Sequence, residues 1–133
     1  MTLREVLHAH IPTLTRESTV RDAVDKMDIY QFPALVVVNE NRRPIGVITE
    51  GDLCRAVSQR DSLTSMSNEP AHIHMSVDPT TMSTDAEIAD AFHKMLSSGL
   101  TVLPVVEDDR LAGVVLRIDL MQAMLLDLSC AND

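Results

Sequence analysis

The amino-acid sequence predicts a mixed α/β fold made of two pseudo-symmetric copies of one unit. Residues 46–53 and 113–120 both contain a glycine that is followed, after five intervening residues, by Asp-Leu. The agreement continues upstream at a period of roughly 67 to 68 residues, and each copy shows the order helix, strand, strand, helix. The matched upstream residues are Val20 with Ile88, Asp22 with Asp90, Ala23 with Ala91 and Met27 with Met95. We place the boundary near residue 68, which gives domains 1–68 and 69–133.

Each copy begins with a predicted amphipathic helix. Thr84 and Glu87 have the spacing of a capping box, and the apolar residues from Ile88 to Met95 recur at helical intervals. Thr19 and Asp22 form a weaker copy of this signal. Residues 2–7 contain another Thr-x-x-Glu and predict a short N-terminal helix.

Short β-branched segments at residues 35–38 and 102–106 predict buried strands, and each ends in a polar turn. Residues 44–48 and 111–115 return as second strands. Each then leads into a second helix that is expected to start near Asp52 or Asp119. Residues 58–76 are polar and lack periodicity, so we expect a surface connection there.

The composition excludes several classes of function. Twenty acidic and eleven basic side chains give a net charge of −9, and the chain has one tyrosine, two phenylalanines and no tryptophan. General nucleic-acid binding is disfavoured because this charge repels phosphates and few rings can stack on bases. No apolar run approaches the ~20 residues that cross a bilayer, and no signal peptide is evident. We therefore expect a cytoplasmic protein without a membrane partner, and Cys54 and Cys130 show no disulfide pattern.

Residues 49–52 carry groups with binding chemistry at the predicted start of a helix. Thr49 supplies a hydroxyl, Asp52 a carboxylate, and Gly51 permits a close approach to the backbone. Such a helix N-terminus can hold a phosphate while the carboxylate accepts hydrogen bonds from sugar hydroxyls. Alternatively, Thr49 and Asp52 only cap their own helix. Asp119 recurs although Leu116 has no hydroxyl, which favours a role for the aspartate beyond the cap.

These motifs resemble a tandem pair of cystathionine β-synthase (CBS) domains, also called a Bateman module. The resemblance rests on residues 46–53 and on residues 103–107 with 113–115, and it covers the chain from about Ile11 to Leu128. It implies two β-α-β-β-α repeats that pack through their sheets and leave two clefts. It also implies a regulatory module that senses energy state or metabolites by binding AMP, ADP, ATP or S-adenosylmethionine.

The resemblance also assigns residues to each cleft. The residues implied in the first cleft are Thr49, Asp52, Pro79, Thr80, Leu100, Thr101 and Val102. Those implied in the second cleft are Asp119, Arg117, Ile11, Pro12, Pro33, Ala34 and Leu35. We expect the second cleft to be weaker because Leu116 replaces the hydroxyl residue, although Arg117 can supply charge. Val37 stands at the position where the other repeat has Pro104, so the pocket wall formed by the first repeat is expected to differ as well.

Other functions receive less support from the sequence. Two His-x-His pairs, His8 with His10 and His72 with His74, have a spacing that suits a metal on an extended strand, but no further ligand completes a set and no metal is expected. No P-loop, HExxH or nucleophile-base set indicates an enzyme or a cofactor. The alternative to nucleotide sensing is a ligand-free dimerisation module. A homodimer is expected in either case, since helix residues 120–128 present a broad apolar stripe, and the regulated protein is unknown.

Overall fold

The computed structural model describes the backbone of residues 1–131 and the side chains of residues 1–127. The chain forms two compact units. The central unit is Pro12–Pro79, and the flanking unit combines Met1–Ile11 with Thr80–Asp133. The N-terminal residues therefore belong to the unit that contains the second copy of the repeat, whereas the linear boundary near residue 68 assigned them to the first.

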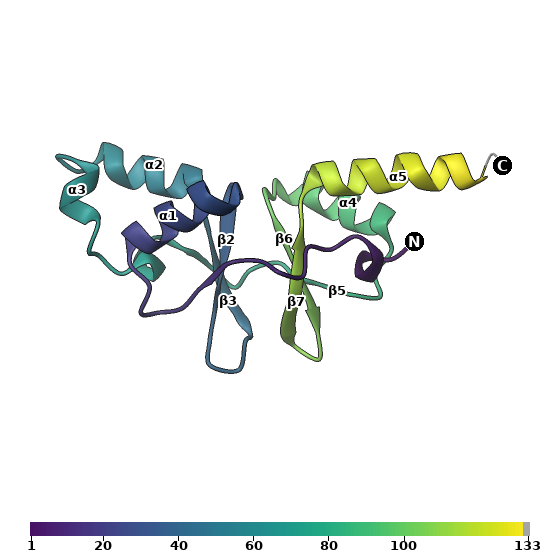
Figure 1. Cartoon of the computed structure of the whole chain (residues 1–133), viewed down its shortest axis with the longest axis horizontal. Helices are drawn as coiled ribbons and strands as arrows, with labels where there is room; N and C mark the ends of the chain where they lie inside the picture. Colours follow the sequence, from purple (N-terminus) through teal and green to yellow (C-terminus); the bar gives the residue numbers. More distant parts are fainter. Residues whose placement is uncertain (132–133) are drawn as a thin grey trace. The chain divides into compact units, whose positions relative to one another are not determined.

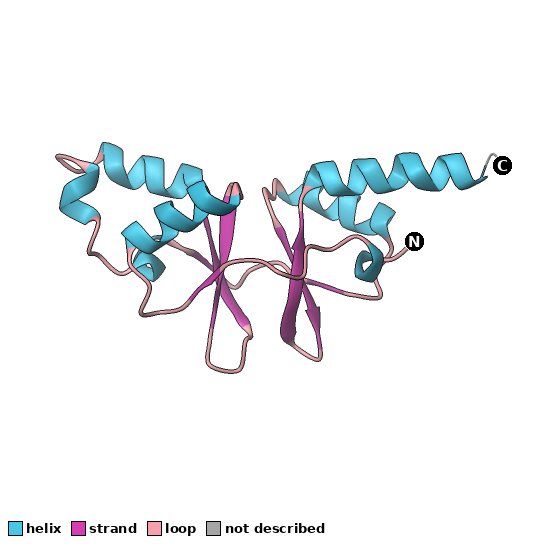
Figure 2. Ribbon diagram, viewed as in Figure 1, coloured by secondary structure: helices cyan, strands magenta, loops and turns pink. Residues whose placement is uncertain are grey.

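The central unit contains a four-stranded sheet in the order β1-β2-β3-β4. Strands β1 (Thr13–Leu14) and β2 (Ala34–Val38) are parallel, and β3 (Pro44–Thr49) pairs antiparallel with β2 and with β4 (Ser76–Val77). Its helices are α1 (Val20–Tyr30), α2 (Glu50–Ser58) and the short α3 (Leu63–Met66), followed by the 3-10 turn η2 (Ala71–His74). Figures 1 and 2 show α1 and α2 on one side of this sheet.

The core of the central unit lies between this sheet and the helices. Its buried residues come from every layer, because alternate strand residues and one face of each helix point inward. They are Leu14, Val20, Ala23, Leu35, Val37, Ile48, Leu53, Met66 and Ala71.

The flanking unit repeats the arrangement with a three-stranded sheet in the order β5-β6-β7. Strand β5 (Met82–Ser83) is parallel to β6 (Leu103–Glu107), which is antiparallel to β7 (Arg110–Val115). Helices α4 (Ile88–Ser98) and α5 (Arg117–Ala131) pack against each other. The N-terminal turn η1 (Leu3–Glu5) completes the unit. Two copies of strand, helix, strand, strand, helix confirm the predicted mixed α/β class.

The N-terminal segment is held in the flanking unit by its side chains and its backbone. Leu3 is completely buried in the core that also contains Ile88 and Met95. The Leu3 N–H donates to the Ala86 carbonyl at 2.9 Å. His8 forms an isolated antiparallel bridge with Val114 on β7. Figure 1 shows this purple segment among the elements of the flanking unit.

The capping predictions had opposite outcomes in the two copies. Thr19 and Asp22 form a capping box at the start of α1, with backbone-to-side-chain bonds of 2.9 and 3.2 Å. The clearer-looking pair, Thr84 and Glu87, does not form one. Helix α4 begins at Ile88 with Glu87 as the N-cap and no side-chain cap bond. The buried Thr84 lies before the helix, and its hydroxyl accepts from Arg4 at 2.9 Å.

Two other expectations need correction. Residues 58–76 are more than a surface connection, because they include α3, η2 and the start of β4 and bury Met66 and Ala71 completely. The second correction concerns the alignment of the repeats. Val47 on β3 pairs with Val36, and its counterpart Val114 pairs with Pro104, so Pro104 corresponds to Val36 and not to Val37.

Candidate functional site

Thr49 and Asp52 lie where β3 turns into α2. The Asp52 N–H donates to the Thr49 hydroxyl at 3.0 Å, and the Thr49 N–H donates to Asp52 Oδ2 at 2.9 Å, which completes a capping box. Arg55, one turn further along, donates from Nη2 to Asp52 Oδ1 at 2.6 Å. The Asp52 side chain is 16% exposed and that of Arg55 is 72% exposed. Thr49 and Asp52 therefore do cap α2, and the exposed guanidinium of Arg55 lies beside the Asp52 carboxylate.

Asp119 occupies the corresponding place at the start of α5. Its Oδ2 accepts from the Leu116 N–H at 2.8 Å, so half of the capping box persists without a threonine hydroxyl. The same oxygen lies 2.9 Å from His8 Nε2. Because an ionised carboxylate only accepts hydrogen bonds, the imidazole donates this one. The Asp119 side chain is 19% exposed and that of His8 is 44% exposed.

Two other candidate residues of the central unit, Pro33 and Ala34, contact the start of α2. The Glu50 N–H donates to the Pro33 carbonyl at 2.9 Å, and Ala34 pairs with Thr49 across the sheet. Leu35 is 2% exposed and belongs to the hydrophobic core, so its side chain packs inside the unit. Pro12 and Pro79 are the first and last residues of the unit, and both are half-buried.

The flanking unit contains the remaining candidates. Val102 is buried and Leu100 packs against the core, so both have structural roles. They lie next to the pair formed by Leu103 and Val115 and therefore at the same end of the sheet as Asp119. Arg117 is exposed in the first turn of α5. Ile11, Thr80 and Thr101 are half-buried.

Two basic side chains that the sequence analysis did not select contact the aspartates. Arg55 could have been found, because a charged residue three positions along a helix lies on the same face as Asp52. His8 is 111 positions from Asp119 in the sequence. A tertiary contact, the backbone bridge between His8 and Val114, brings it to the site.

A sequence comparison decides the family. The profile described as CBS domain matches residues 3–59 and again residues 71–126. The chain belongs to the CBS-domain family. This confirms the resemblance predicted from the duplicated motifs.

Relatives of this CBS pair are known by sequence and by structure. An uncharacterized 17.7 kDa protein of Acidianus ambivalens is 32% identical over 80% of this chain and 63% of its own length. The chain spans less than two thirds of the first curated relatives that it matches. The structure of CBSX2 in complex with AMP has a TM-score of 0.81 at 22% identity and covers 94% of this chain and 96% of that chain.

A second solved structure is the CBS domain pair of protein MJ0100 in complex with 5′-methylthioadenosine and S-adenosyl-L-methionine. Its TM-score is 0.77 at 20% identity, with 93% of this chain and 95% of that chain covered. At these identities, both structures show that the CBS pair shares their fold.

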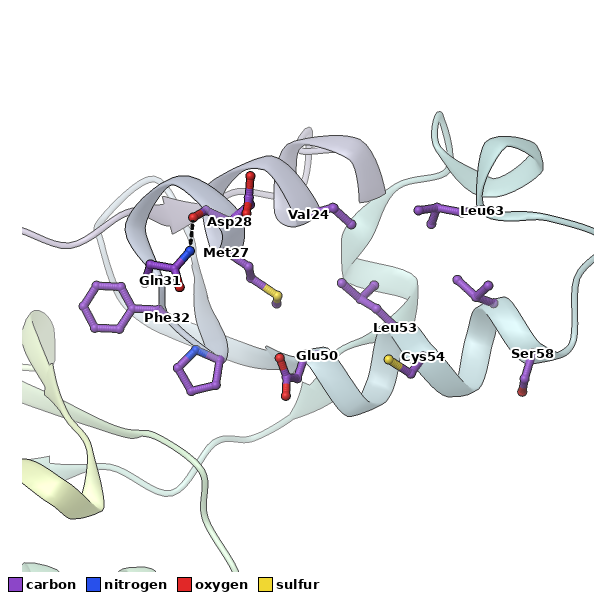
Figure 3. A pocket seen from close by; sticks show the side chains of 12 residues that line it. Val24, Met27, Asp28, Gln31, Phe32, Glu50, Leu53, Cys54, Ser58 and Leu63 are labelled. Carbon is purple, nitrogen blue, oxygen red and sulfur yellow. Dashed lines mark hydrogen bonds between the residues drawn. The ribbon is translucent and has the colours of Figure 1, made fainter.

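The CBS pair also has an open pocket of about 730 Å³ between α1 and α2 in its central unit (Figure 3). Apolar side chains form most of its wall, and Asp28, Glu50 and Cys54 also line it. Of the residues selected from the sequence, only Pro33 lines this pocket. The lining residues are Val24, Met27, Asp28, Gln31, Phe32, Pro33, Glu50, Leu53, Cys54, Val57, Ser58 and Leu63.

The histidine pairs of this CBS chain do not converge on a metal site. His8 contacts Asp119, and His72 Nδ1 lies 3.1 Å from the Arg16 carbonyl. His74 Nε2 is buried 3.7 Å from Glu69 without a hydrogen bond. Among residues 1–127, no three His, Cys, Asp or Glu side chains are grouped to hold an ion. No helix in the described part of the chain is long and apolar enough to cross a membrane.

Proposed function

We propose that this CBS pair is a regulatory, non-catalytic module of the cytoplasm that binds an adenosine-containing ligand, with Asp52 as the main ribose-binding residue. The observation that carries the proposal is the group formed by Thr49, Asp52 and Arg55. A largely buried carboxylate can accept hydrogen bonds from the two ribose hydroxyls, and an exposed guanidinium beside it can pair with a phosphate.

The ligands named for the two solved CBS pairs support this class of ligand. One holds AMP, and the other holds 5′-methylthioadenosine and S-adenosyl-L-methionine. All three contain adenosine. We therefore propose AMP, ADP, ATP or S-adenosylmethionine as the ligand of this chain.

We propose Asp119 as a second, weaker ribose-binding residue. It keeps the carboxylate at the start of α5, but Leu116 supplies no hydroxyl, and Arg117 is the nearest arginine in the sequence. The other residues assigned to the two clefts by family resemblance remain predictions.

The test is a thermal-shift panel of these ligands, followed by calorimetry. A ligand at 100 times its Kd stabilises a folded protein by about 2.7 kcal/mol, which corresponds to a rise in Tm of roughly 5 to 10 °C. Asp52→Ala removes hydrogen bonds to a charged group, which are worth about 1.5 to 3 kcal/mol, and should weaken binding at least about tenfold.

Two variants make this test specific. Asp52→Asn keeps a side chain that can cap α2 but loses the negative charge, so it separates binding from stability. Glu40→Ala removes an exposed acidic residue from the turn before β3 and should bind like the wild type. If no adenosine compound shifts the Tm, or if Asp52→Ala and Asp52→Asn both bind with wild-type affinity, the assignment of Asp52 is wrong.

We also propose that the chain is a homodimer. Helix α5 exposes Ile118, Met121 and Leu126 by 61%, 41% and 54%, and a second copy can cover this surface. The same observation supports the alternative function, a dimerisation module without a ligand. A flat thermal-shift panel together with a dimer in solution would favour that alternative.

A further inference from the structure

The two units allow a direct comparison of the groups beside each ribose-binding aspartate. Ser76 pairs with Val47 on β3, and His8 bridges Val114 on β7, so Ser76 and His8 occupy equivalent positions. In the helices, Arg55 is three residues after Asp52, whereas Gln122 is three residues after Asp119. The basic side chain beside the aspartate therefore comes from helix α2 in one unit and from the N-terminal segment in the other.

The backbone of His8 is fixed against β7. Its N–H donates to the Val114 carbonyl at 2.9 Å, and its carbonyl accepts from the Val114 N–H at 3.1 Å. This close approach requires Gly113, because a Cβ at that position would overlap the His8 carbonyl oxygen. The imidazole therefore reaches Asp119 from a segment whose backbone is fixed, and it can leave only by rotation about its own side-chain bonds.

The two basic side chains form hydrogen bonds with different oxygens of their aspartates. Arg55 bonds Asp52 Oδ1, whereas the Thr49 N–H bonds Oδ2. At Asp119 both donors, the Leu116 N–H and the His8 imidazole, use Oδ2. Arg55 has a long, exposed side chain, so it can turn to a ligand phosphate and remain in the site. The shorter His8 side chain, on its fixed backbone, stays at Asp119 Oδ2, where it and the Leu116 N–H use both acceptor positions of that oxygen. Two ribose hydroxyls can therefore bond both oxygens of the carboxylate only after His8 leaves.

We propose that His8 is a specificity-determining residue of the Asp119 site, which a nucleoside must displace before its two ribose hydroxyls can bond both oxygens of the carboxylate. This inference rests on the proposed function. It makes the Asp119 site weaker than the Asp52 site for adenosine compounds, and it links occupation of the Asp119 site to release of the His8 side chain.

The experiment uses the full chain with Asp52→Ala, which silences the stronger site, and adenosine as the probe in calorimetry. His8→Ser copies the residue found at the equivalent position of the other unit. Removing one competing hydrogen bond should tighten adenosine binding about three- to tenfold, while the Tm of the free protein falls. His10→Ser removes an exposed histidine from the same segment and should leave the affinity unchanged.

A purely structural role predicts a different result. If His8 only stabilises the fold, His8→Ser lowers the Tm and leaves the affinity unchanged or weaker, which would overturn the proposal. Imidazole ¹⁵N spectra of the wild type give a second readout. The Nε2 signal of His8 should change when adenosine fills the Asp119 site, and this change should be absent in Asp119→Asn.

The design separates this inference from the proposed function. If the wild type binds adenosine compounds through Asp52 but the variant with Asp52→Ala and His8→Ser binds none, the His8 proposal alone fails. If neither the wild type nor any variant binds an adenosine compound, the proposed function fails and the inference fails with it.

Discussion

At the scale of single residues, the repeated glycines Gly46 and Gly113 have a common structural cause. Each lies on a strand that is crossed closely by a second segment. A Cβ at Gly113 would overlap the His8 carbonyl oxygen, a backbone atom, whereas at Gly46 it would first meet the Met75 side chain. A methionine side chain can move aside more easily than a hydrogen-bonded backbone can.

Gly113→Ala should therefore destabilise the protein by about 1 to 3 kcal/mol, the usual cost of adding a methyl group to a packed position. Gly46→Ala should cost less, because part of its clash is with a flexible side chain. Urea unfolding followed by circular dichroism measures both values. Gly51→Ala is the control, since a Cβ there is 3.4 Å from its nearest neighbour, an ordinary contact. Equal losses for Gly46→Ala and Gly113→Ala would contradict this explanation.

At the scale of elements, the sequence predicted the order of helices and strands because apolar periodicity and turn residues are local signals. The compact units differ from the predicted linear boundary at the N-terminus for a physical reason. The N-terminal segment packs through Leu3 and pairs through His8, and both contacts join residues far apart in the sequence. The same limit applies to the site. The motif at Thr49 and Asp52 was readable from its spacing, whereas the approach of His8 to Asp119 depends on tertiary structure.

Ion pairs also hold the N-terminal segment and the segment that leads to β4. Arg4 donates to Glu107 at 2.6 Å and thereby ties the N-terminal segment to β6, and Arg60 donates to Glu69 at 3.0 Å at the start of the segment that returns to β4. Hydrogen bonds from the arginines lower the pKa of both Glu107 and Glu69 below the usual 4.5. A carboxyl group with a lowered pKa in the folded state stabilises the fold only while it is ionised.

The stabilisation from these pairs should therefore be fully present above a pH of about 4.5, the ordinary pKa of these glutamates, and should be lost as the pH falls through the lowered values. Urea unfolding from pH 7 to pH 3 tests this. A variant with Glu69→Gln and Glu107→Gln should be less stable than the wild type at pH 7, and the difference should shrink towards pH 3. Because the pairs are exposed, salt should reduce the effect. A difference that is constant over this range would show that the ion pairs do not contribute in this way.

At the scale of the whole molecule, the stripe predicted on residues 120–128 divides into buried and exposed parts. Leu120 is completely buried and Met124 packs against the core of the flanking unit, whereas Met121 is 41% exposed. Leu128 lies outside the described side chains. Ile118 and Leu126 extend the exposed part. One face of α5 therefore builds the unit, and the apolar surface that remains is available for association.

This exposed surface leads to the prediction that the chain forms a homodimer and that α5 contributes to the interface. Light scattering should give twice the monomer mass at micromolar concentration, because burying apolar surface drives association. A variant with Met121→Glu and Leu126→Glu places two charges on this surface and should shift the mass to that of a monomer while the fold, followed by circular dichroism, is kept. Thr81→Glu adds a charge to the exposed loop before β5 and should remain dimeric. If the wild type is monomeric at all accessible concentrations, or if the doubly charged variant still dimerises as the wild type does, α5 is not the contact between copies.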